Sequence, residues 1–152
     1  MRSTWPAALA ALAALNARLP GALGATPVQG GHPEPRVVVD VVHVAGPHKR
    51  AEIEREARRA LWGKIIACYR PAAAKRPGLR GEATLRFRVG ADGSVGGLRA
   101  EQSTLGDGEL VACFQGHVAG LALPKAGAES DVAMQIHVAP GDRPGAPRAA
   151  GR

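Results

Sequence analysis

Acidic residues, aromatic residues and long apolar runs are all scarce in this 152-residue chain. Thirteen Asp and Glu oppose 20 Lys and Arg, so the formal net charge is +7. The two Trp, two Phe and one Tyr offer little for stacking on bases, which disfavours a binder of single-stranded nucleic acid. No uninterrupted run of about 18 apolar residues occurs, so no complete transmembrane helix is expected. The 45% apolar content still excludes wholly disordered protein.

Catalytic and nucleotide-binding motifs are also missing. Gly63-Lys64 is not a phosphate-binding loop, because Ile65 replaces the required Ser or Thr and Arg58 stands at the position of the first Gly. No G-x-S-x-G or H-E-x-x-H motif is present. We therefore expect a non-enzymatic protein with no catalytic residue, cofactor or bound metal.

Residues 1–25 have the layout of a secretory signal peptide. Arg2 precedes an apolar core from Trp5 to Leu15, and small residues follow up to Ala25. No Cys follows the core, so we expect a cleaved leader rather than a lipoprotein anchor, and a periplasmic or otherwise exported protein. The alternative is an alanine-rich first helix of a cytosolic domain, which Pro6 and Pro20 disfavour.

Proline and glycine mark the limits of one folded domain. Residues 26–35 contain three Pro and two Gly, which predicts an extended linker. Residues 140–152 again contain three Pro and three Gly without hydrophobic periodicity, which predicts a disordered tail. The domain is therefore expected at 36–139.

The first half of this domain predicts a strand and a helix. Arg36 to Val44 is rich in β-branched residues and reads as a strand. From Lys49 to Tyr69 apolar residues recur every three to four positions, which predicts an amphipathic helix that should end before Pro71.

The second half predicts a hairpin, a helix and a last strand. Glu82 to Val89 alternates between apolar and polar residues, and Asp92-Gly93 turns the chain into a second strand, Val95 to Thr104, with a bulge at Gly96-Gly97. Asp107 is a plausible N-cap of the next helix, whose apolar positions are Leu110, Phe114, Val118 and Leu121. Asp131 to Val138 alternates again. The order β-α-β-β-α-β predicts an α+β fold with two helices packed on one face of a small antiparallel sheet.

Cys68 and Cys113 lie on or beside the apolar stripes of the two expected helices. In an exported protein such a pair favours a disulfide, and the alternative is two buried free thiols. His117 follows Cys113 by one helical turn, which is the spacing of a Cys/His nucleophile or of half of a metal site. The missing further ligands favour a solvated histidine instead.

Cations are concentrated near the second strand. The expected basic patch consists of Arg70, Lys75, Arg76, Arg80, Arg86 and Arg88. Such a patch could meet an acidic protein, anionic lipid head groups or a polysaccharide. A small basic nucleic-acid-binding protein remains the alternative, with a Cys/His enzyme as a weaker one.

Several short motifs follow one another between Lys49 and Val138: Cys68-Tyr69-Arg70, Pro77 to Glu82, Leu85 to Val89, Asp92 to Val95, Ser103 to Leu105, Leu110 with Cys113, and Leu123-Pro124. In this order they resemble the AgmX/PglI C-terminal domain, a myxobacterial relative of the TonB C-terminal domain named after gliding-motility proteins. The resemblance implies helices on a small sheet and protein contact in the cell envelope, linked to envelope transport or gliding motility.

In TonB-like domains the last strand lies at a sheet edge and accepts an extended partner segment. The resemblance therefore implies that the partner, an envelope protein or extended peptide, binds at Asp131, Val132, Ala133, Met134, Gln135, Ile136, His137 and Val138. The strand at Val37 to Val44 could instead pair with this edge and close it, and its valines favour an occupied edge.

Overall fold

Four strands and two helices follow one another in residues 33–142, which are the residues that the computed structural model describes. They are β1 (Arg36–Ala45), α1 (Arg50–Lys75), β2 (Gly81–Val89), β3 (Val95–Ser103), α2 (Gly108–Ala119) and β4 (Ser130–Ala139). The α+β class and the β-α-β-β-α-β order confirm the prediction. The expected leader, most of the linker and most of the tail lie outside the described residues.

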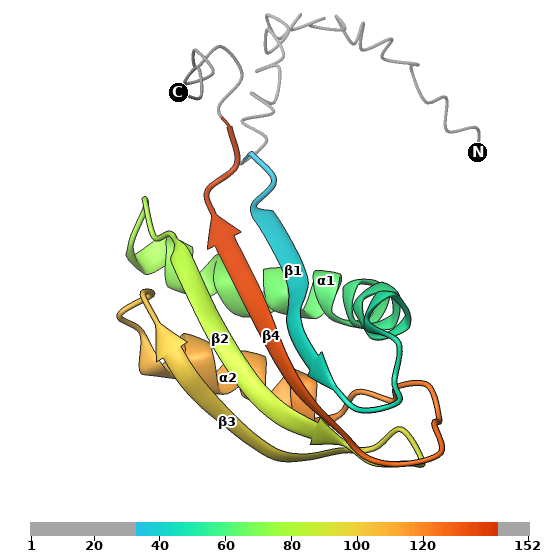
Figure 1. Ribbon diagram of the computed structural model, residues 1–152. Coiled ribbons are helices and arrows are strands. Elements are labelled where there is room, and N and C mark those ends of the chain that lie inside the picture. The colour runs from blue at the N-terminus through green and yellow to red at the C-terminus, as the bar shows by residue number, and fades with distance from the viewer. Residues whose placement is uncertain (1–32, 143–152) are drawn as a thin grey trace, which may run out of the picture. The chain divides into compact units, whose positions relative to one another are not determined.

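The strands form one antiparallel sheet in the order β1-β4-β2-β3. Both helices lie behind this sheet in Figure 1, so they cover the same face, as predicted. Alternation along β2 sends Leu85 and Phe87 toward the helices, whereas Arg86 and Arg88 lie on the open face. One face of the sheet is therefore apolar and packed, and the other is polar.

The hydrophobic core fills the space between the sheet and the helices. Its largest fully buried side chains come from both layers and include Tyr69, Phe87, Phe114, Leu61 and Met134. Fully burying a side chain of this size contributes about 1.5–3 kcal/mol, so a core with few aromatics still supplies the main stabilising term.

The expected end of α1 at Pro71 is wrong, because the helix continues through Pro71 to Lys75. Proline removes one backbone donor, but the next residues are alanines, which have the highest helix propensity. Ala72 and Ala73 also pack against the core, and the Arg76 N–H donates to the Ala72 carbonyl at 3.0 Å. Packing and capping thus outweigh the loss of one hydrogen bond.

The β2–β3 turn anchors the connection that follows α2. Gly93 has φ +86°, and a Cβ at this position would lie 1.9 Å from the Leu123 carbonyl oxygen. The Leu123 N–H donates to the Gly93 carbonyl at 3.0 Å. The bulge expected at Gly96-Gly97 is present, since the β2–β3 register shifts there and Gly97 has φ +61°.

Candidate functional site

The two cysteines connect the helices. The Sγ atoms of Cys68 in α1 and Cys113 in α2 lie at disulfide-bond distance, 1.93 Å, with their Cα atoms 6.1 Å apart. This is the pair that the sequence favoured, and the two residues are 45 positions apart in the chain. His117, one turn after Cys113, lies beside them, and its ring nitrogen is within 4.8 Å of both sulfur atoms. His117 is half-buried, so part of its ring remains accessible to solvent.

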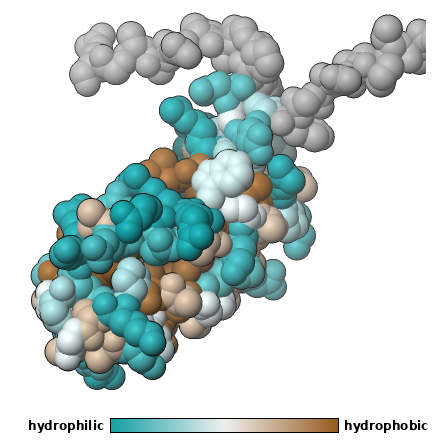
Figure 2. Space-filling model, turned by 90° about the vertical axis from the view of Figure 1, so that its right-hand side faces the viewer, coloured by the Kyte–Doolittle hydropathy of each residue, from teal (hydrophilic) through white to brown (hydrophobic). Residues whose placement is uncertain are grey.

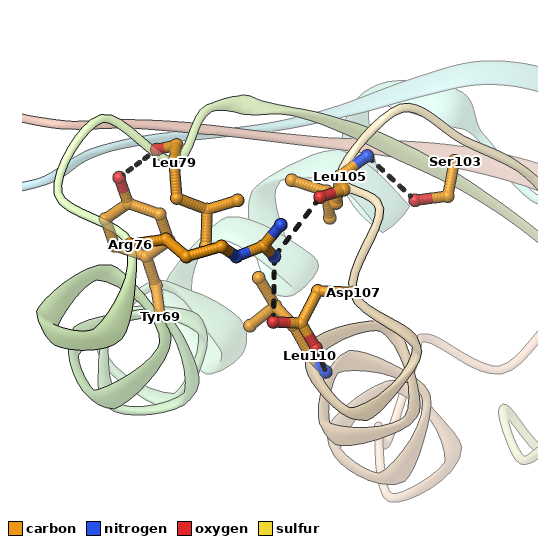
Figure 3. Close-up of polar contacts among 7 residues, drawn as sticks. All are labelled: Tyr69, Arg76, Leu79, Ser103, Leu105, Asp107 and Leu110. Carbon is orange, nitrogen blue, oxygen red and sulfur yellow. Dashed lines mark hydrogen bonds and ion pairs between the residues drawn. The ribbon is translucent and has the colours of Figure 1, made fainter.

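A second link joins the end of α1 to the start of α2 (Figure 3). Arg76 Nη2 donates to Asp107 Oδ2 at 2.9 Å and to the Leu105 carbonyl at 3.4 Å. The other carboxylate oxygen of Asp107 accepts the Leu110 N–H at 3.0 Å, which confirms the predicted N-cap. This backbone hydrogen bond and the nearby guanidinium lower the pKa of Asp107. Arg76 therefore has a structural partner.

The six cations expected to form one basic patch lie on different sides of the domain. Arg70, Lys75 and Arg76 are at the end of α1, whereas Arg86 and Arg88 are on the open sheet face. Four of the six contact a carboxylate, in the pairs Arg70–Glu34, Arg76–Asp107, Arg86–Glu101 and Arg88–Glu129. Much of the positive charge is thus paired locally.

The partner-binding edge expected at Asp131–Val138 requires correction. β4 is an inner strand, because β1 pairs with it from Arg36 to Ala45 on one side and β2 pairs with it on the other. Val39 and Val41 of β1 are buried in the core, which explains why this strand occupies the edge. The structure shows the occupied β4 edge that the valines of residues 37–44 favoured.

Among residues 33–142 the outer strands of the sheet are β1 and β3, and they differ in regularity. The β3 register against β2 shifts twice, between Thr84 and Leu85 and between Arg86 and Arg88. Such bulges interrupt the regular spacing of the outward backbone groups and blunt an edge against further pairing. β1 keeps an unbroken register from Arg36 to Val41 before a single shift. β1 therefore offers the more regular edge.

Arg58 of α1 reaches the outer side of this regular stretch. Its Nε donates to the Val39 carbonyl at 2.8 Å, which shows that this carbonyl points away from β4. Its Nη2 lies 2.6 Å from Asp40 Oδ1 and 2.6 Å from Glu54 Oε1. The sequence indicated only the Glu54–Arg58 spacing on the helix. The contacts of Arg58 with Asp40 and Val39 join residues that are 18 and 19 positions apart, so no local sequence pattern predicts them.

Exposed apolar side chains lie on β1 and α1, the two elements that Arg58 connects. Val38 is 45% exposed and Val42 is 44% exposed on β1, and Trp62, one turn after Arg58 on α1, is 50% exposed. Figure 2 views the molecule from the right-hand side of Figure 1 and shows hydrophobic side chains between hydrophilic ones. We call Val38, Val42, Arg58 and Trp62, with the outer backbone of β1, the β1 edge site.

A shallow depression of about 820 Å³ lies at the end of α1, lined mainly by prolines and alanines with Tyr69 and Arg70. The Tyr69 hydroxyl donates to the Leu79 carbonyl (Figure 3). Burial raises the pKa of Tyr69, and the Arg80 charge partly opposes this shift. Among residues 33–142, Arg70 is the one charged residue of this lining.

A buried histidine–serine contact lies just after the C-terminal end of β1. His48 Nδ1 lies 2.7 Å from Ser130 Oγ, and the His48 N–H donates to the same oxygen at 3.2 Å. His48 is 6% exposed and Ser130 is 1% exposed, so this pair cannot reach a substrate and instead ties the β1–α1 turn to β4. The sequence did not reveal it, because the residues are 82 positions apart.

No family model, curated protein or solved structure matches this chain. Of the two helices in residues 33–142, neither is long and apolar enough to cross a membrane.

Proposed function

We propose that this chain is a non-enzymatic, exported protein-interaction module of the cell envelope that binds an extended segment of a partner protein as an additional strand beside β1. The proposal extends the resemblance to the AgmX/PglI C-terminal domain and its link to envelope transport or gliding motility. It moves the binding edge from β4 to β1.

The hydrogen bond from Arg58 to the Val39 carbonyl carries the proposal. Within residues 33–142, it identifies a regular outer strand whose outward Val39 carbonyl is covered by the Arg58 side chain and not by a further strand. Displacing Arg58 costs its hydrogen bond to the Val39 carbonyl and two partly exposed ion pairs, the ion pairs being worth about 0.2–1 kcal/mol each. A partner strand forms several main-chain hydrogen bonds of about 0.5–1.5 kcal/mol each, so strand addition outweighs that loss.

The neighbouring side chains define the chemistry of the partner. Val38 and Trp62 offer apolar surface, and aromatic residues such as Trp are frequent binding hot spots. Once Arg58 is displaced, Asp40 and Glu54 lose their shared cation. The segment is therefore expected to be mostly apolar, with a Lys or Arg that takes the place of Arg58.

Charge supports a protein partner over nucleic acid. The β1 edge site lies beside the carboxylates of Asp40 and Glu54, which repel phosphates. Four of the six cations of the expected patch already contact acidic side chains. Phosphate binding requires free cations along the path of the backbone.

The experiment is selection of peptides from a random phage-displayed library on the full chain, followed by affinity measurements on the selected peptides. Every second amide of a bound strand faces β1. N-methylation of the amides that face β1 should therefore abolish binding, whereas N-methylation of the intervening amides should leave binding unchanged. Trp62→Ala and Val38→Lys should weaken binding at least about tenfold. Arg58→Ala should strengthen it, and the neighbouring Arg59→Ala serves as the matched control.

A variant of the other outer strand completes the design. Gln102→Lys on β3 should leave affinity unchanged. Peptides that lose affinity with Gln102→Lys but not with Val38→Lys would place the site on β3. Failure to select any extended peptide, together with oligonucleotide binding that persists at physiological salt, would favour the nucleic-acid alternative.

A further inference from the structure

A cluster of three metal-binding side chains spans the two helices, on residues that the β1 edge site does not use. Cys68 Sγ, Cys113 Sγ and a ring nitrogen of His117 all lie within 4.8 Å of one another. This is the only such group of three among residues 33–142. Cys113 and His117 face the same side of α2 because they are one turn apart, and Cys68 meets them from α1.

We propose that the domain binds one zinc-type divalent metal ion through Cys68, Cys113 and His117 when the Cys68–Cys113 bond is reduced, and that the metal then replaces the disulfide as the link between α1 and α2. Thiolate and imidazole are ligands that Zn²⁺ prefers, and three protein ligands leave a fourth tetrahedral position open to water. Cys113 and His117 are half-buried, so water can reach that position.

The geometry requires only small movements. In a tetrahedral site with Zn–S of about 2.3 Å and Zn–N of about 2.0 Å, the ligand atoms lie about 3.5–3.8 Å apart. Once the S–S bond is broken, the two sulfur atoms must separate to about that distance in any case. The His117 nitrogen already lies within 4.8 Å of both, so side-chain rotations can close the remaining gap.

The chemistry balances with a dithiol as reductant. The dithiol gives two electrons and two protons to the Cys68–Cys113 bond, becomes a disulfide itself, and leaves two protein thiols. Zn²⁺ then displaces one proton from each thiol into the buffer. Two thiolates, one neutral imidazole and one divalent ion give a site with no net charge, which suits its partly buried position.

The test uses the full chain, reduced with dithiothreitol, freed of reductant without air and titrated with Co²⁺ and then Zn²⁺. We expect one Co²⁺ per chain with thiolate-to-cobalt charge-transfer absorption, which Zn²⁺ removes. The oxidised chain should show none of this absorption. His117→Ala should lower the affinity about tenfold or more, whereas His43→Ala, on β1 outside the cluster, should not change it.

Circular dichroism of each sample shows whether the reduced chain keeps its helices. Equal metal affinity of the His117→Ala and His43→Ala variants would overturn the three-ligand site. The proposal also fails if reduction abolishes the helical signal and Zn²⁺ does not restore it.

Discussion

Breaking the Cys68–Cys113 link should remove a large share of the domain's stability. The cysteines are separated by 45 positions, and a closed loop of this length contributes about 4 kcal/mol in the chain-entropy model. Total stabilities of small domains are about 5–15 kcal/mol, so the reduced domain should remain folded with about 1–11 kcal/mol of stability. With a urea slope of about 2 kcal/mol/M, the unfolding midpoint should fall by about 2 M.

The assay compares urea unfolding with and without dithiothreitol, in the presence of a chelator so that no metal replaces the link. The double variant Cys68→Ala/Cys113→Ala is the control, and reductant should not change its midpoint. Alkylation before and after reduction, read by intact mass, reports whether the thiols are paired. A midpoint shift below about 0.5 M in chains that gain two alkyl groups only after reduction would refute the loop-closure reasoning.

Three further predictions concern the caps, the turns and the leader. Hydrogen bonding from backbone N–H lowers the pKa of Asp107, so its carboxylate stabilises the fold above the unfolded pKa of about 3.9 and loses this effect as the pH falls; Asp107→Ala should lower the Tm at pH 7 much more than at pH 2, and an equal loss at both would contradict this. Gly93→Ala should destabilise strongly, because its Cβ would clash with a backbone carbonyl, whereas Gly116→Ala, with open space on α2, should stabilise by about 0.5–1 kcal/mol; urea unfolding compares them, and equal effects would contradict the geometry. N-terminal sequencing of the mature protein should begin near Ala25 or Thr26, and an intact N-terminus on a cytosolic product would reject export.

Local patterns predicted the elements and the shared helix face well. The alternation in β2, the Asp92-Gly93 turn and the Asp107 cap all depend on neighbours within a few residues, and such signals are present in the sequence itself. The helix end predicted at Pro71 was wrong because the missing backbone donor of Pro71 is visible in the sequence, whereas the tertiary packing of Ala72 and Ala73 that compensates for it is not.

These patterns predicted the strand order only in part, through the valines that favoured an occupied β4 edge, and they did not predict the β1 edge site. The valines of β1 indicated burial, but the alternation of apolar and polar residues within one strand does not identify the strands that pair with it. Only the three-dimensional register shows that β4 lies between β1 and β2. Likewise, the contact of Arg58 with Val39 depends on how α1 crosses the sheet, so no spacing in the sequence predicts it.

Amide hydrogen exchange of the full chain with and without a selected peptide tests the proposed β1 edge site most directly. The Val39 carbonyl points away from β4, and in an antiparallel strand the N–H of the same residue and those two positions away point the same way. Peptide binding should therefore slow exchange at the Val37 and Val39 amides and leave β3 unchanged. Protection confined to β3, or tight binding without protection of any β1 amide, would contradict strand addition at this edge.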